Sequence, residues 1–364
     1  MKRSTKNENG HRHGGIRQED FSRWGVSDRP VTDFSVNLNP LGPPPLIRER
    51  WGRLYGEIEP YPTVNGAGVA RYYEKRYGIG PETFIAGNGS TELIYLLPRA
   101  LGLRRVAVVT PSYNDYSRAS RIAGASIRPC PLRQEKAGFS PAMDDLVEGM
   151  EEGDALWLGN PNNPTGTLFR SELILDLAER FPEKWVIVDE AFMPFVEERE
   201  NYSLLVPSRP KNVLVLHSLT KFYALAGIRM GGLAAAPDVV RRVQGLKEPW
   251  TVNGVAEKIA PLLLECRAYE EESLSLLRKE KARLHRMLGK VPGLSPLSPS
   301  VNFLLCQWTF TEDLDDLLGH LLREGIYVRD CRNFPGLERN WFRAAVRLPE
   351  ENDRLALALG SFSP

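Results

Sequence analysis

From residue 84 onward, the chain alternates short apolar runs of the length of a β-strand with amphipathic stretches of the length of an α-helix. This alternation is typical of an α/β domain with a mainly parallel sheet, because each helix returns the chain so that the next strand runs in the same direction. The runs that we predict to be strands are 84–86, 106–110, 155–158, 185–188, 213–216 and 232–236.

Unusual polar residues stand just beyond the carboxyl ends of five of these runs. They are the segment 87–92, Tyr113, the segment 160–166, the pair Asp189 and Glu190, and the segment 218–221. In open α/β sheets, ligands bind beyond the carboxyl ends of the strands. The positions of these residues therefore predict one ligand site along this edge of the sheet.

The segment that follows the apolar run 212–216 carries the most specific chemistry. It presents two hydroxyls, Ser218 and Thr220, then the amine of Lys221 and, eight residues later, the guanidinium of Arg229. This set suits an aldehyde cofactor that carries a phosphate, because the amine can bind the aldehyde covalently while the hydroxyls and the guanidinium hold the dianion. Taken alone, the lysine would more often be a solvated surface charge.

Other polar clusters supply groups that such a cofactor would need. The segment 87–92 combines glycines, hydroxyls and the start of a helix, which makes an anion cradle or only an ordinary helix N-cap. Asn163, in a turn rigidified by two prolines, can donate to a ring oxygen. Asp189, at the end of a buried strand, would stabilise a protonated pyridine ring or cap the next turn. Tyr113 offers a flat face for stacking.

The flanking parts of the chain do not show the alternation of strand-length and helix-length segments. Before the large α/β region lie an extended, proline-broken stretch at 33–45 and a short helix, and after it come a long charged helix, a proline-rich link and short strands and helices. We therefore expect an N-terminal arm, 1–58, that joins the small domain, a large cofactor-binding domain, 59–255, and a small α+β domain, 256–364.

Composition excludes several classes of function. Lys and Arg number 47 against 46 Asp and Glu, so a net charge of +1 gives no field for nucleic acid or an anionic membrane. The four cysteines are far apart, which argues against a zinc site or a disulfide framework and for reduced thiols. No apolar run reaches the ~18 residues that span a bilayer. We expect a soluble cytoplasmic protein without a bound metal.

Taken together, these residues resemble the fold-type I pyridoxal-phosphate enzymes of the aspartate aminotransferase superfamily, over essentially the whole chain. The resemblance implies a mainly parallel seven-stranded sheet in the large domain, pyridoxal 5'-phosphate as cofactor, and a homodimer with shared active sites. The implied catalytic residues are Lys221 as covalent anchor, Asp189 as pyridinium partner, Asn163 at the phenolic oxygen and Tyr113 stacked on the ring. The implied phosphate contacts are Gly89, Ser90, Thr91, Ser218 and Arg229, together with Tyr61 from the neighbouring subunit.

Within the superfamily, the chain most resembles the threonine-phosphate decarboxylases of cobalamin biosynthesis. The stretches that carry this likeness are 13–15 (His-Gly-Gly), 33–42, 218–223 and 329–337. The stretches 13–15, 33–42 and 329–337 lie outside the generic cofactor set, and they imply a second dianion site, for the phosphate of the substrate, formed by His13, Asn39 and Arg329. Arg343 would grip the substrate carboxylate.

Three residues raise questions for this resemblance. Phe192 stands where many relatives have a tyrosine that bonds the ring oxygen, so this interaction would be absent. His217 stands where we expect an arginine. Arg332 adds positive charge near Arg329, and the sequence does not tell whether it faces the site.

Three functions remain open from the sequence. The resemblance favours decarboxylation of L-threonine O-3-phosphate to (R)-1-amino-2-propanol O-2-phosphate. An aminotransferase acting on a substrate such as histidinol phosphate would use the same cofactor contacts, and a non-catalytic regulator would need a DNA-binding appendage that the residues before His13 do not resemble. Threonine phosphate and serine phosphate differ by one methyl group, worth only ~1–3 kcal/mol in a pocket.

Overall fold

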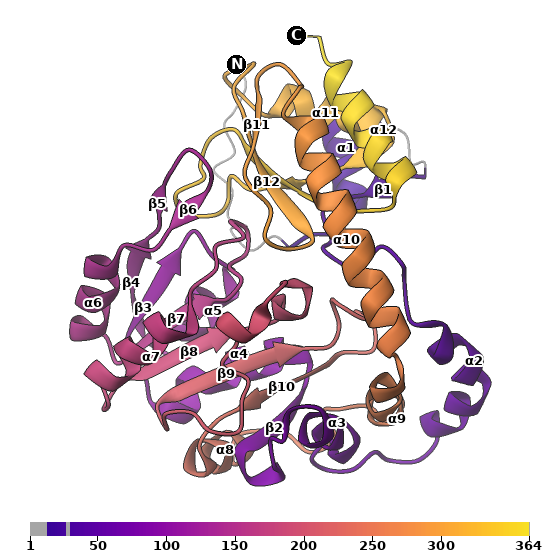
Figure 1. The fold of residues 1–364 in the computed structure, drawn as a ribbon. Coiled ribbons are helices and arrows are strands. Elements are labelled where there is room, and N and C mark those ends of the chain that lie inside the picture. The colour runs from indigo at the N-terminus through magenta and orange to yellow at the C-terminus, as the bar shows by residue number, and fades with distance from the viewer. Residues whose placement is uncertain (1–12, 27–29, 364) are drawn as a thin grey trace.

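The computed structural model describes residues 13–26 and 30–363 (Figure 1). Its large lobe is built on a seven-stranded sheet in the order β2-β10-β9-β8-β7-β3-β4. Only β10 runs antiparallel to its neighbours within this sheet, so the predicted, mainly parallel architecture is confirmed. In spatial order, the strands are β2 (Phe84–Asn88), β10 (Met230–Ala234), β9 (Val213–Ser218), β8 (Trp185–Asp189), β7 (Ala155–Gly159), β3 (Arg105–Thr110) and β4 (Ser126–Pro131).

All six predicted strands are present, and β4 is the one that the prediction lacked. It pairs only with β3, at the edge of the sheet, and it contains Pro129 and Pro131. An edge strand tolerates proline because one row of its N–H groups has no partner strand. The half-exposed, proline-containing sequence therefore has no apolar run by which it could be recognised.

Helices cover both faces of the large sheet (Figure 1). Side chains of successive residues in a strand point to opposite faces: in β9, Val213 and Val215 join one apolar cluster, while Leu214 and Leu216 join the other. On the first face lie α3 (Ala67–Tyr77), α6 (Met143–Glu152), α7 (Ser171–Arg180) and α9 (Gly254–Leu262). On the second lie α4 (Gly89–Leu101), α5 (Asp115–Ile122) and α8 (Pro237–Gln244). The sheet is thus buried on both sides, as its apolar strands require.

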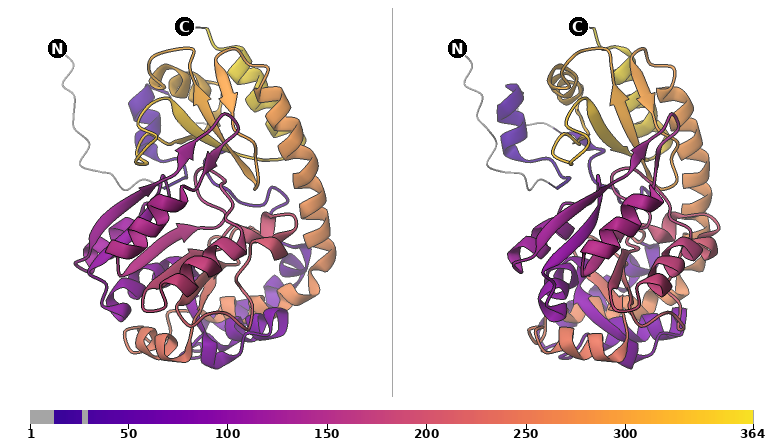
Figure 2. Two further views of the ribbon diagram at one scale, coloured as in Figure 1. Left: turned by 60° about the vertical axis from the view of Figure 1, so that its left-hand side comes forward. Right: turned by 90° about the vertical axis from the view of Figure 1, so that its left-hand side faces the viewer.

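The small lobe is a four-stranded antiparallel sheet covered by helices. Its strands, in order, are β11 (Leu294–Pro296), β12 (Phe303–Trp308), β15 (Trp341–Ala345) and β14 (Arg329–Asp330). Its helices are α10 (Arg267–Leu288), α11 (Asp315–Arg323) and α12 (Pro349–Gly360). Figure 2 shows α10 running along the side of both lobes. A separate hairpin, β5 (Arg133–Gln134) and β6 (Phe139–Ser140), projects from the large lobe.

The N-terminal arm contacts the small lobe. Its strand β1 (Thr32–Asp33) pairs with β13 (Ile326–Tyr327), and the N–H of Ala345 donates to the carbonyl of Phe34 (2.8 Å). The arm also contains α1 (Gln18–Trp24), α2 (Pro45–Leu54) and the 3-10 turn η1 (Tyr55–Ile58). The exact domain boundaries at residues 58 and 255 stay a prediction.

Two expected elements are divided in the structure. The long charged helix is interrupted just after Pro261 by the 3-10 turn η5 (Leu263–Glu265), so that α9 packs with the large lobe and α10 leads into the small one. The sequence analysis also expects short strands after the long helix, and the segment 326–330 forms two of them, β13 and β14, which belong to different sheets. Among the described residues, no helix has the length and apolar character to cross a membrane.

Candidate active site

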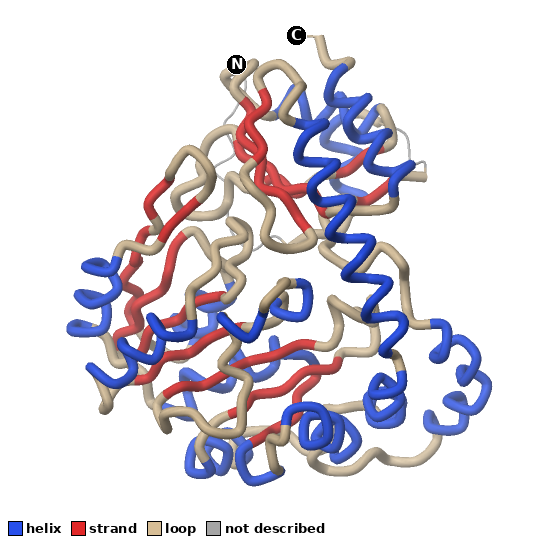
Figure 3. Tube along the Cα trace, viewed as in Figure 1, coloured by secondary structure: helices blue, strands red, loops and turns tan. Residues whose placement is uncertain are grey.

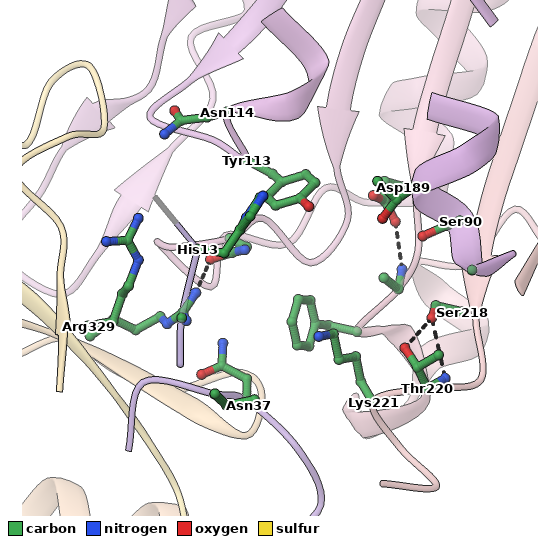
Figure 4. Close-up of a pocket in the computed structure, with 18 of the residues that line it drawn as sticks. His13, Asn37, Ser90, Tyr113, Asn114, Asp189, Ser218, Thr220, Lys221 and Arg329 are labelled. Carbon is green, nitrogen blue, oxygen red and sulfur yellow. Dashed lines mark hydrogen bonds between the residues drawn. The ribbon is translucent and has the colours of Figure 1, made fainter. Parts of the chain in front are cut away.

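A cavity of about 370 Å³ opens where the loops at the carboxyl ends of the large-sheet strands meet the arm and the small lobe. Figure 3 shows these loops gathered between the two lobes. Of the fourteen predicted site residues, twelve line this cavity, and only Asn39 and Tyr61 do not. Figure 4 shows two ends: Lys221, Asp189, Ser90 and Ser218 lie at one, and His13, Asn37 and Arg329 at the other.

Lys221 and Asp189 line the same end of the cavity. Lys221 comes three residues after the end of β9, and burial lowers the pKa of its amine to about 8, with the Arg343 and Arg229 guanidinium groups adding to the effect and Asp189 opposing it. A substantial fraction of the amine is therefore neutral near pH 8, the form that attacks a carbonyl.

Asp189 is the last residue of β8 and is nearly buried. Burial raises the pKa of its carboxyl above the ordinary value, and hydrogen bonds from the Ala191 N–H (2.9 Å) and the Tyr116 hydroxyl (2.9 Å), with the charge of Lys221, oppose that rise. These two donors hold a carboxylate that would otherwise be costly to bury.

Tyr116 is a site residue that the sequence prediction missed. It lies on α5 one helical turn after Tyr113, lines the cavity and stacks on Trp157 at 5.0 Å between ring centroids with an angle of 11°. The i, i+3 spacing from Tyr113 would have placed the two tyrosines on one side of the helix start. Its bond to Asp189 had no signal in the sequence, because the two residues are 73 positions apart.

The anion cradle depends on a close approach that only glycine allows. Gly89 begins α4 at φ +71°, and a Cβ there would lie 2.6 Å from Nη2 of Arg229. Ser90 and Thr91 follow in the first turn of this 13-residue helix, whose amides and dipole favour an anion. A hydroxyl pair, Ser218 and Thr220 at 2.7 Å, completes the cradle. The donor set and the space fit a phosphate dianion.

Arg343 and Asn163 join the cradle end to the small lobe. Arg343 on β15 donates through Nη1 to Oδ1 of Asn163 and through Nη2 to the carbonyl of Ser35 (2.8 Å). Its Nε is buried and has no partner among the described residues, and burial lowers its pKa to about 10. A buried guanidinium with a spare donor is suited to a carboxylate ligand. Phe192 also lines the cavity and packs edge-on against Phe303.

Asn39 does not line the cavity, contrary to the prediction. Its Nδ2 donates to the carbonyl of Phe222 (2.9 Å) and to Oγ of Ser273 (2.7 Å), which fixes the arm to the body of the protein. Asn37 lines the cavity instead, at the centre of a tight turn that is closed by the bond from the Leu38 N–H to the Val36 carbonyl.

Asn37 is 3% exposed, and neither polar atom of its side chain has a partner among the described residues. Leaving such groups buried and unsatisfied costs about 1–3 kcal/mol each. A polar ligand at this end of the cavity would satisfy them. The nearby Arg329 donates to Oδ1 of Asn333 (2.9 Å), and its guanidinium lies 5.2 Å from the ring centroid of Phe334.

The remaining questioned residues lie outside the cavity. Tyr61 is 83% exposed and its ring centroid is 5.2 Å from that of Trp250. His217 is buried, its Nδ1 is 2.9 Å from the Tyr73 hydroxyl, and burial lowers its pKa to about 3, so it remains neutral. Arg332 is paired with Asp313, Asp315 and Asp330 and does not line the cavity.

Comparisons with known proteins agree on one family. Residues 30–359 match the family model described as aminotransferase class I and II. The chain is 34% identical, over 95% of both chains, to the threonine-phosphate decarboxylase of Salmonella typhimurium. It is 33% identical, over 90% of both chains, to the histidinol-phosphate aminotransferase of Desulfitobacterium hafniense. The structure of histidinol-phosphate aminotransferase from Sinorhizobium meliloti in complex with pyridoxal-5'-phosphate has the same fold, with a TM-score of 0.81 at 19% identity over 98% of this chain and 97% of that one.

Proposed function

The chain belongs to the class I and II aminotransferase family, and from this premise we propose that it decarboxylates L-threonine O-3-phosphate to (R)-1-amino-2-propanol O-2-phosphate and carbon dioxide in cobalamin biosynthesis. The cofactor is pyridoxal 5'-phosphate, which fits the glycine-dependent cradle, the buried carboxylate of Asp189 and the amine of Lys221. When bound, this cofactor supplies an electron sink for the electrons of a bond broken at the substrate Cα.

One observation carries the choice of substrate: two guanidinium groups, Arg329 and Arg343, face the cavity from directly opposed positions of neighbouring strands. Such opposed residues have Cβ atoms about 5 Å apart, and like charges in this arrangement repel. Both arginines are 5% exposed, so solvent screens them little. A substrate with two separate anionic groups offsets this repulsion, and threonine phosphate has a carboxylate and a phosphate, whereas histidinol phosphate has only the phosphate.

The residues of this chain then divide the work. Arg343 holds the carboxylate and thereby sets the direction of the Cα–carboxylate bond, while Arg329, Asn37 and His13 hold the phosphate. Lys221, with a pKa of about 8, can carry a proton and deliver it to Cα after carbon dioxide has left. Tyr113 and the carboxylate of Asp189 keep the cofactor ring in place.

Incubation of the purified holoenzyme with L-threonine O-3-phosphate is expected to release carbon dioxide without any added 2-oxo acid. The reason is that decarboxylation regenerates the enzyme in each cycle, whereas transamination needs an amino acceptor. Carbon dioxide and the amine product are measured together, with unphosphorylated L-threonine as control, and histidinol phosphate plus 2-oxoglutarate as the competing reaction. Consumption of the 2-oxo acid in a one-to-one ratio with substrate would contradict decarboxylation and favour the aminotransferase.

We also propose a homodimer with shared active sites, supported by a group of exposed apolar side chains on the arm and the segment after α8. These are Trp51, Tyr55, Ile58, Tyr61 and Trp250, all between 48% and 83% exposed. Exposed apolar groupings of this kind commonly mark a protein interface. In a dimer, Tyr61 of a second copy would reach the phosphate cradle, which explains why this tyrosine is absent from the cavity of its own chain.

Mixing inactive Tyr61→Ala and Lys221→Ala variants is expected to restore activity to about a quarter of the wild-type value, because half of the randomly formed dimers are hybrids with one complete site. Subunits are exchanged, and carbon dioxide release is measured. The matched control mixes Asp189→Ala with Lys221→Ala: both residues belong to the same chain's site, so no hybrid contains a complete one. Equal activity in the two mixtures would rule out sharing through Tyr61.

A further inference from the structure

The buried carboxylate of Asp115 lies behind His13, outside the cavity, and we infer that Asp115 is a positioning residue that orients and charges His13 for the phosphate of the substrate. This inference rests on the proposed function, since it concerns the same phosphate. Asp115 does not line the cavity, so it acts through His13 rather than on the substrate.

The chain first brings His13 to the cavity by a close backbone approach. Gly14 lies against the arm so tightly that a Cβ would be 2.3 Å from the carbonyl oxygen of Ser35. The N–H of Gly15 donates to Oγ of Ser35 (2.7 Å), and the N–H of Ile16 donates to Oδ2 of Asp33 (3.3 Å). The His-Gly-Gly sequence thus fixes the path of the segment, and the imidazole projects to the cavity beside Tyr113 (Figure 4).

The carboxylate of Asp115 contacts the imidazole of His13 from the start of α5. Asp115 is the first residue of α5 and is 0% exposed. Its Oδ1 accepts a hydrogen bond from the Tyr95 hydroxyl (2.7 Å), and its Oδ2 is 3.4 Å from Nε2 of His13. A carboxylate so deeply buried is stabilised by such partners and by the positive end of its helix. Each of its two oxygens thus faces a different partner, Tyr95 or His13, which fixes the orientation of the carboxylate.

This contact decides which hydrogen bonds His13 can make. Because Nε2 faces the Asp115 carboxylate at 3.4 Å, Nδ1 is the ring nitrogen left for the substrate. Nδ1 is an acceptor in the neutral ring that carries its proton on Nε2, and a donor in the imidazolium. A phosphate dianion offers acceptors alone, so its recognition requires the charged ring. The carboxylate favours that form, while the cavity's cations, Lys221, Arg329 and Arg343, oppose it; Tyr113, with its ring centroid at 5.6 Å, is the other titratable neighbour.

Asp115→Asn keeps the shape and the acceptor for Tyr95 but removes the charge. We expect it to raise KM for L-threonine O-3-phosphate about tenfold, with kcat changed less than twofold, the loss of one charge-assisted contact. His13→Gln should raise KM similarly, and the double variant should be no worse than His13→Gln alone, since residues that act as a unit are not additive. The matched control is Tyr95→Phe, which removes a bond to the same carboxylate and keeps its charge; its KM should stay within about twofold.

Two outcomes would overturn the inference: additive effects in the double variant, or loss of cofactor affinity in Asp115→Asn parallel to the rise in KM. The first would mean that Asp115 acts independently of His13, and the second that it only supports the fold. An inactive wild-type enzyme would instead overturn the proposed function. In that case the coupling between Asp115 and His13 is measured by binding: L-threonine O-3-phosphate is titrated into each variant while the cofactor absorbance is followed. The same non-additivity is expected in the Kd values.

Discussion

Replacing Lys221 with alanine is expected to abolish turnover and, at the same time, the absorbance that reports the covalent bond between the cofactor and the protein. The loss in kcat should be about 10⁴-fold or more, because the variant lacks both the anchor and the group that carries a proton to Cα. Burial lowers the pKa of this amine to about 8, so it is a better nucleophile at neutral pH than the amine of a solvent-exposed lysine, which stays protonated. Absorbance of the purified protein and carbon dioxide release are the two measurements.

The control is Lys281→Ala, because Lys281 is also partly buried but pairs with Glu197 on the side of α10, away from the cavity. This variant should keep both the absorbance and the activity. Thermal unfolding of each variant establishes that the fold persists. If Lys221→Ala released carbon dioxide at the parental rate, the assignment of Lys221 would be wrong, however well the cradle fits a phosphate.

The sequence predicted the large sheet well because its strands are buried on both faces and therefore appear as uninterrupted apolar runs. The same parallel arrangement brings the carboxyl ends of β3, β7, β8 and β9 to one edge, which is why residues as distant as Tyr113 and Lys221 were expected at one site. Lys221 and Asp189 indeed line a common cavity, as the covalent hypothesis requires.

What the sequence did not yield depends on contacts between distant segments. Asn37 and Asn39 are two residues apart in the same arm, and the tight turn centred on Asn37 decides which one reaches the cavity. Tyr116 and Asp115 have no motif of their own, since their roles come from Asp189 and His13, each far away in the sequence. Edge strand β4 lacks an apolar run because it is largely exposed and therefore needs fewer apolar side chains than the central strands.

The arm shows how far its sequence alone can place a ligand-facing side chain. It contacts the small lobe through the pairing of β1 with β13 and through the hydrogen bond from the Ala345 N–H to the Phe34 carbonyl. The extended stretch at 33–45 was expected from its prolines, but the prolines restrict the backbone without telling which side chain faces a ligand. The side chain of Asn39 donates hydrogen bonds to the Phe222 carbonyl and the Ser273 hydroxyl, and it is Asn37 that lines the cavity.

Asp189→Asn is expected to lower kcat about 10³-fold while leaving the covalent attachment of the cofactor to Lys221 intact. Asparagine matches the shape of the side chain and can still accept the Ala191 N–H, so the change removes a negative charge rather than a side chain. In the proposed site, that charge would keep the pyridine ring of the cofactor protonated, and electrostatic effects of this kind reach several kcal/mol. Steady-state kcat and the cofactor absorbance are measured on the same preparation.

Tyr116→Phe separates the charge of Asp189 from its orientation. This variant keeps the carboxylate and the stack on Trp157 but removes the 2.9 Å hydrogen bond, so kcat should fall only about tenfold, the value of one hydrogen bond to a charged group. Equal losses in Asp189→Asn and Tyr116→Phe would show that orientation matters and the charge does not. An Asp189→Asn enzyme with more than a tenth of the parental kcat would show that ring protonation is dispensable, and the electron-sink role assigned to the pair of Asp189 and Lys221 would have to be given up.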